Sequence, residues 1–150
     1  MRTFGSVEEL RAAVGEDLGT SAWILVDQQR IDRFADATDD HQWIHVDPER
    51  AAHGPFGRTV AHGFLTVALM PAFGWDTFAV SDVAMTVNYG MNKVRFPSPV
   101  PVGSRLRGHS RLLDVTDVPG GVQATIGGTV EIEGWPKPAC VAEIVLRYLT

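Results

Sequence analysis

The sequence of 150 residues is poor in several features that mark whole classes of protein. Its one cysteine, Cys140, allows no internal disulfide, which fits a reducing compartment. The formal net charge is −5 and lysine and arginine form no run, so we expect no nucleic acid as a partner. The most apolar window, residues 63–73, is too short for a membrane span, which takes about 20 residues.

Other absences narrow the function further. Residues 1–5 carry no apolar run of the kind found in signal peptides, so we expect a soluble, cytoplasmic protein with no membrane partner. No cluster of cysteine and histidine has the spacing of a zinc site, which predicts that no metal is bound. No glycine-rich phosphate loop follows a predicted strand.

The chain holds enough apolar residues for one packed domain. With 45% hydrophobic and 21% charged residues, we expect a single globular domain over residues 1–150. Helices are predicted in the first half, where Ser6, Asp27 and Asp47 each stand in a capping position. A short strand is expected over residues 23–26.

Residues 61–73 are apolar on nearly every face, which predicts a helix that other structure must wrap. Pro71 should kink this helix or lie near its end, and Gly74 is a natural stop. Strands are then expected over residues 83–96, 105–115, 122–132 and 139–149. Helices followed by antiparallel strands indicate an α+β protein, and one buried helix with a sheet large enough to curl around it favours a hot-dog fold.

Residues 40–45 read DHQWIH and place an acid, Asp40, five positions before an imidazole, His45. Such a spacing does not put both side chains on one helix face, but a turn could bring them to one pocket. An aspartate and a histidine there could share one water and transfer its protons. The plainer alternative is a helix-end acid and a half-buried, hydrogen-bonded histidine.

Gly63 stands where the apolar helix is expected to begin. Its N–H would have no partner within the helix and could polarise the carbonyl oxygen of an acyl group. A glycine chosen for close packing of helix on sheet explains the residue equally well. The chain alone leaves both interpretations open.

Three segments together resemble the MaoC-like, (R)-specific enoyl-CoA hydratases: residues 40–45, residues 56–65 (FGRTVAHGFL) and residues 92–103 (NKVRFPSPVPVG). The resemblance runs from Asp27 to the last strand. It implies a hot-dog fold, a homodimer, and hydration of trans-2-enoyl thioesters to (3R)-hydroxyacyl thioesters. It places the catalytic acid on Asp40, the catalytic histidine on His45 and the carbonyl-binding glycine on Gly63. No separate cofactor is implied, because coenzyme A is part of the substrate.

The sequence departs from the family pattern at two positions. Many members read Asp-x-Asn-Pro-x-His, whereas Gln42 and Trp43 occupy the Asn and Pro positions here. Gln42 keeps an amide that could support the acid or the water, and Trp43 would reshape the pocket wall. Lys93 and Arg95 are candidates to meet the phosphates of coenzyme A, with solvated strand charges as the alternative.

Other functions remain open on the same fold, because a fold does not determine a reaction. A hot-dog acyl-CoA thioesterase, a non-catalytic acyl-binding module and a dehydratase acting on acyl-carrier-protein substrates are the alternatives. A homodimer is also expected from the sheet itself, since about five strands leave an exposed edge that a second copy can cover.

Overall fold

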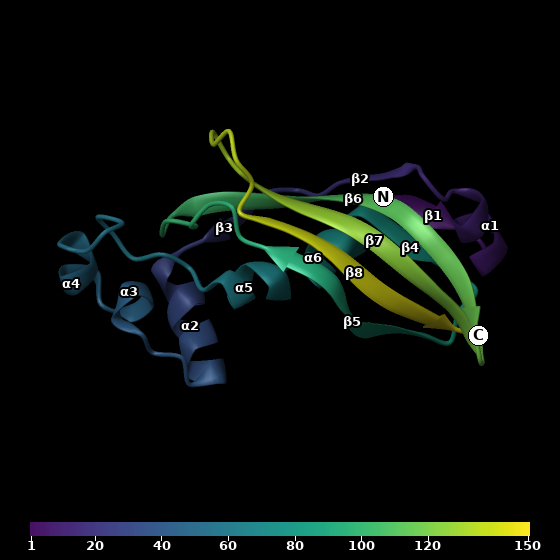
Figure 1. The fold of residues 1–150 in the computed structure, drawn as a ribbon, viewed down its shortest axis with the longest axis horizontal. Coiled ribbons are helices and arrows are strands. Elements are labelled where there is room, and N and C mark those ends of the chain that lie inside the picture. Colours follow the sequence, from purple (N-terminus) through teal and green to yellow (C-terminus); the bar gives the residue numbers. More distant parts are fainter.

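Four long strands from the second half of the chain build the main sheet of the computed structural model, which describes all of residues 1–150 (Figure 1). They are β5 (Met85–Arg95), β6 (Ser104–Val118), β7 (Gly121–Ile132) and β8 (Cys140–Leu149). The sheet order is β2-β6-β7-β8-β5, with β2 (Asp17–Thr20) at one edge and β3 (Ile24–Val26) also pairing with β6, and every pair is antiparallel. The predicted strands are confirmed within a few residues.

The N-terminal elements cover one end of this sheet. A two-stranded parallel sheet joins β1 (Arg2–Phe4) to β4 (Phe78–Val80), and neither strand was predicted. The predicted first helix is α1 (Val7–Ala12), where the hydroxyl of Ser6 accepts the Glu9 N–H. The Glu9 carboxylate reaches back to the N–H of Gly5, one residue before the cap.

Three helices gather at the other end of the sheet (Figure 1). Helix α2 (Gln28–Thr38) begins at the Asp27 cap and ends where Asp39 takes a left-handed conformation, φ 57°. Helix α4 (Pro48–Ala52) begins at the Asp47 cap, as predicted. The one-turn helix α3 (Trp43–Val46) between them was not predicted, because four residues are too few to show a helical period.

The apolar stretch forms two short helices rather than one. They are α5 (Gly63–Ala68) and α6 (Met70–Thr77), separated at Leu69. Pro71 lies in the first turn of α6, where a missing N–H breaks no helical hydrogen bond. The prediction that Gly74 ends the helix is wrong, since α6 continues through it to Thr77. The longest helix, α2, has 11 residues, and no helix is long and apolar enough to cross a membrane.

The sheet covers one face of this helix pair and leaves the other open. Leu65, Leu69 and Phe73 pack in the core, whereas Phe64 is 74% and Trp75 is 64% exposed. The prediction that other structure surrounds the helix on all sides is therefore wrong for this chain on its own. The exposed residues recur at helical spacing, so they form one stripe along the helix pair, made of Phe64, Ala68, Pro71, Ala72 and Trp75.

The covered face sits close to the sheet because β6 carries a glycine beneath it. A Cβ atom at Gly108 would lie 2.5 Å from the Cβ of Phe73, which is 2% exposed. No side chain fits in that space, so the benzyl group of Phe73 packs on bare backbone. Gly108 thereby sets how near α6 approaches the sheet.

We predict that Gly108→Ala lowers the free energy of unfolding by about 1–3 kcal/mol, because the added methyl overpacks a filled core. Urea unfolding followed by tryptophan fluorescence measures the change. Gly74→Ala is the matched control, since a Cβ there meets no atom within 4 Å, and it should not destabilise. Equal stability of the Gly108→Ala variant and the wild type would contradict this account of the helix position.

Candidate active site

Three loops at the α2–α4 end of the molecule bring Asp40, His45 and His62 together. Asp40 follows the end of α2, His45 lies in α3, and His62 is the residue before α5. One donor atom from each side chain lies within 4.8 Å of the other two. The turn that the sequence required for Asp40 and His45 to meet is therefore present.

His45 is buried, and its hydrogen bonding leaves one ring nitrogen free. Its Nδ1 lies 2.6 Å from the carbonyl oxygen of Val60 and must donate to it, since a carbonyl only accepts. A neutral His45 therefore carries its lone pair on Nε2. Burial, and next the neighbouring His62, lower the pKa of His45, while the Val60 carbonyl and Asp40 act in the opposite direction. The ring is thus held towards its neutral form, with Nε2 able to accept a proton.

His62 is the residue of this group that the sequence analysis missed. It lies stacked on His45, with ring centroids 3.8 Å apart and planes 23° from parallel, and Phe34 packs against it from another side. Its Nε2 donates to the backbone carbonyl of Asp40 at 2.9 Å and lies 4.0 Å from the Asp40 carboxylate. Its position directly before Gly63 was the available signal.

The other ring nitrogen of His62 has no partner. Nδ1 is the one fully buried side-chain polar atom in the chain that makes no hydrogen bond. Leaving such an atom unpaired typically costs about 1–3 kcal/mol. A packing role alone does not account for placing a polar ring here.

Asp40 is the solvent-facing member of the group. Its side chain is 53% exposed, and one carboxylate oxygen accepts the N–H of Gln42 at 3.4 Å. Gln42 therefore contacts the acid through its backbone, and its side-chain amide makes no hydrogen bond to the protein. The ring of Trp43 packs against α4, 4.4 Å from the guanidinium of Arg50 and close to Gly54.

Gln28 holds the loops in place relative to one another, a role that no sequence pattern indicated. From the first turn of α2 its amide nitrogen donates to the His45 carbonyl at 2.7 Å, and its amide oxygen accepts the buried Thr59 hydroxyl at 2.6 Å. Backbone bonds add to this, from Val60 to Ile44 at 3.0 Å and from Ala61 to Val100 at 2.8 Å. The proline-rich connection therefore supports the segment that enters α5.

Gly63 is the first residue of α5, and its N–H makes no hydrogen bond within the protein. A Cβ atom at this position would lie 3.1 Å from the ring of Phe96. Both properties considered from the sequence, a free N–H and a close packing contact, are therefore present.

Lys93 and Arg95 both lie on β5 with exposed side chains. The ammonium of Lys93 is 3.2 Å from the Glu143 carboxylate, whereas Arg95 bonds only to the carbonyl of Val94, at 2.7 Å. Arg95 is next to Phe96, which contacts Gly63. Of the two predicted candidates, Arg95 is therefore the cation closer to Gly63 and without an acidic partner.

The donor atoms of Asp40, His45 and His62 are close enough for one metal ion, but their orientation does not favour it. Lone pairs lie in the ring planes, and two nearly parallel rings do not aim their nitrogens at one point. A free imidazole nitrogen, a carboxylate and a free N–H instead suit proton transfer next to a polarised carbonyl.

Comparisons with known proteins agree along the whole chain. A family model described as the MaoC like domain matches residues 9–133. The 3-hydroxyacyl-thioester dehydratase Z of Mycobacterium tuberculosis is 59% identical over 150 residues, which cover 99% of each chain. Nodulation protein N of Rhizobium leguminosarum bv. viciae is 47% identical over 141 residues, covering 91% of this chain and 87% of that protein.

Solved structures show the same fold. The unliganded R-hydratase PhaJ1 from Pseudomonas aeruginosa matches with a TM-score of 0.74 at 22% identity, over 91% of this chain and 81% of that one. An (R)-hydratase from A. caviae involved in PHA biosynthesis matches with a TM-score of 0.73 at 20% identity, over 90% and 96%. The predicted hot-dog fold is confirmed, and the chain belongs to the MaoC-like domain family.

Proposed function

We propose that this hydro-lyase is an (R)-specific enoyl-CoA hydratase, which adds water to a trans-2-enoyl-CoA to give the (3R)-hydroxyacyl-CoA. The name of the relative with 59% identity, a 3-hydroxyacyl-thioester dehydratase, supports this reaction type. The observation that carries the proposal is the convergence of Asp40 and His45, which combines an imidazole whose Nε2 is free of the Val60 hydrogen bond with an acid that solvent can reach.

In this mechanism one water lies between Asp40 and the Nε2 of His45. Its oxygen bonds to C3 of the substrate as one side chain takes its proton, and C2 gains a proton from the same side. The two groups interact closely, so the pair accepts and returns the proton as a unit. A separation below 4.8 Å leaves room for one bridging water.

Gly63 would hold the thioester oxygen through its free N–H while enolate charge develops. One such donor is typically worth about 3 kcal/mol in a transition state. A side chain at this position would press on the ring of Phe96, so glycine leaves the space beside this N–H open to the ligand. Arg95, and with less freedom Lys93, would meet the phosphates of coenzyme A at the neighbouring end of β5.

His62 acts as a positioning residue in this proposal. Its Nε2–H holds the backbone of Asp40, and its ring backs the ring of His45. This neighbouring ring helps to lower the pKa of His45, which keeps His45 available as a base.

We predict that Asp40→Asn and His45→Gln each lower kcat about a hundredfold or more, the usual worth of a general acid–base group. The assay follows the loss of enoyl absorbance with crotonyl-CoA and identifies the product enantiomer by chiral chromatography. Asp39→Asn and His53→Gln are the matched controls, since both residues are exposed neighbours outside the group. Wild-type rates in either test variant would remove that residue from the mechanism.

The same preparations separate the rival functions. Release of free thiol from a saturated acyl-CoA would indicate the thioesterase, and acyl-CoA binding with no turnover would indicate the non-catalytic module. A competition between carriers distinguishes coenzyme A from acyl carrier protein.

The pH dependence of kcat/KM should report His45. Because the pKa of His45 lies below the ordinary 6.5, the neutral base persists at lower pH than usual, and activity is lost only as pH falls through the lowered pKa. We predict that His62→Gln moves this acidic limb to higher pH, since it removes the neighbouring ring and part of the burial. His41→Gln, an exposed histidine bonded to Asp36, should leave the profile unchanged. An unmoved limb in the His62→Gln variant would assign His62 to packing.

We also propose that the protein is a homodimer formed through β5. This strand pairs only with β8, so its second edge is free over 11 residues. Apolar side chains are exposed along it, namely Met85, Val87, Tyr89 and Met91, and the helix pair exposes a further apolar stripe. A free edge beside exposed apolar groups is the usual setting for a second copy.

We predict a species of twice the chain mass of 16.3 kDa in light scattering. Val87→Glu should shift it towards monomer and lower activity with it, because a twofold interface repeats each new charge on both sides. Leu113→Glu is the control, since Leu113 has similar exposure, 39% against 37%, but lies on β6 away from this edge. A Val87→Glu variant that remains dimeric would place the interface elsewhere.

A further inference from the structure

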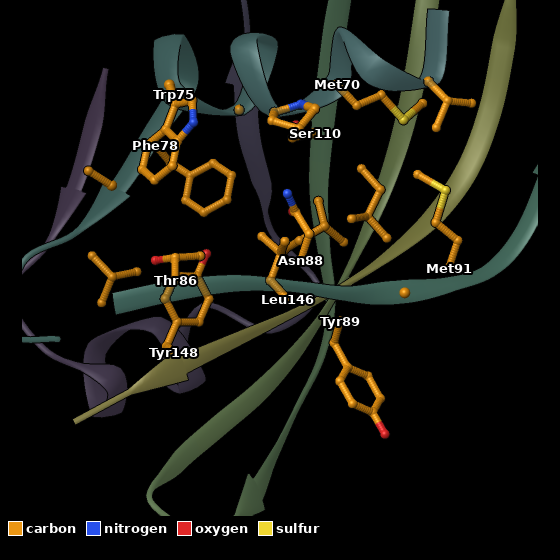
Figure 2. A pocket seen from close by; sticks show the side chains of 18 of the residues that line it. Met70, Trp75, Phe78, Thr86, Asn88, Tyr89, Met91, Ser110, Leu146 and Tyr148 are labelled. Atoms are coloured by element: carbon orange, nitrogen blue, oxygen red, sulfur yellow. The ribbon is translucent and has the colours of Figure 1, made fainter. Parts of the chain in front are cut away.

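A second feature of the chain is a chamber between the helix pair and the sheet. Its volume is about 370 Å³, and 13 of its 19 lining residues are hydrophobic. Figure 2 shows Met70 and Trp75 on the helix side and Leu146 on the strand side. An apolar hollow with a few polar groups is the common form of a small-molecule site.

The chamber extends away from Gly63 along the axis of the helices. Its lining starts at Val67 and Ala68, about one helical turn after Gly63, and reaches Trp75 at the far end. Twelve residues of helix correspond to roughly 18 Å. An acyl chain whose thioester oxygen lies at Gly63 can therefore pass into the chamber with its tail towards Trp75.

The far part of the chamber is not wholly apolar. Thr86 of β5 and Tyr148 of β8 are direct cross-strand partners, and Asn88 lies two residues further on the same face of β5. The side chains of Thr86 and Tyr148 come from paired strands, and Asn88 reaches towards the helices (Figure 2). We call these three residues the polar trio.

The side chains of the polar trio have no hydrogen-bond partner in the protein. Tyr148 is 3% exposed, yet its hydroxyl is not sealed off, because it opens into the chamber. Burial raises the pKa of Tyr148, so the phenol keeps its proton and can donate. A plain alkyl tail in this space would displace water from three polar groups without offering them a hydrogen bond.

We propose that the chamber holds the acyl tail of the substrate and selects tails that carry an uncharged oxygen function, a hydroxyl or keto group, to meet the polar trio. No lysine or arginine lines the chamber, which argues against a carboxylate at that end. This inference rests on the proposed function, since it places the thioester at Gly63.

The test compares matched thioesters of eight to sixteen carbons, one with a plain tail and one with a terminal hydroxyl. Calorimetry with the saturated acyl-CoAs measures binding without turnover, and kcat/KM with the 2-enoyl forms measures selection. At the best-fitting length, the hydroxylated ligand should bind about tenfold more tightly. Tyr148→Phe and Asn88→Leu should each remove most of that preference by weakening the hydroxylated ligand.

Tyr89→Phe is the matched control, because this is the other tyrosine of the chain and its side chain lies on the opposite side of β5 from Asn88 (Figure 2). Turnover of crotonyl-CoA by the wild type, a substrate whose tail is too short to reach the trio, measures the proposed hydratase reaction independently of the chamber. Equal or tighter binding of the plain tail to the wild type, or a preference that survives both substitutions, would overturn the inference. If the wild type did not turn over crotonyl-CoA, the proposed hydratase function would be wrong. The binding comparison with saturated acyl-CoAs would still test whether the chamber selects oxygenated tails.

Discussion

The candidate site depends on two stacked imidazoles that are buried at a junction of loops. Each ring has one N–H, and each N–H is given to a backbone carbonyl: His45 to Val60 and His62 to Asp40. These two bonds join the end of α2, α3 and the start of α5, which are far apart in the sequence. Because the burial of a polar ring is costly unless its N–H is paired, the loops and the rings hold each other in place.

The same two bonds decide the chemistry that the site can offer. Once Nδ1 of His45 donates to Val60, the lone pair of the neutral ring must be on Nε2. Burial lowers the pKa of His45, so the ring does not readily take up a second proton, which would bind to Nε2. The carboxylate, by contrast, stays open to solvent, so the pair combines a sheltered base with an acid that water can reach.

The helix pair packs closely on the sheet along one face and exposes apolar side chains along another. Gly108 lets Phe73 and its helix sit against the backbone of β6, while the chamber lies between the helix pair and strands that include β5 and β8. The free edge of β5 and the apolar stripe on the helices face solvent in the single chain. Both are surfaces that a second copy would use, and the chamber lies beside them.

Much of the architecture was predictable because local signals agree with the final structure. Caps at Ser6, Asp27 and Asp47 and the β-branched runs of the second half mark elements whose stability is mostly local. The α+β class and the identity of Asp40, His45 and Gly63 as candidates also came from the sequence, although their roles stay predictions. The tertiary structure alone decided where the apolar helix breaks, which of its faces stays open, and that Gln28 and His62 complete the site. These depend on contacts between residues distant in the chain, and neither helical period nor capping chemistry carries information about such contacts.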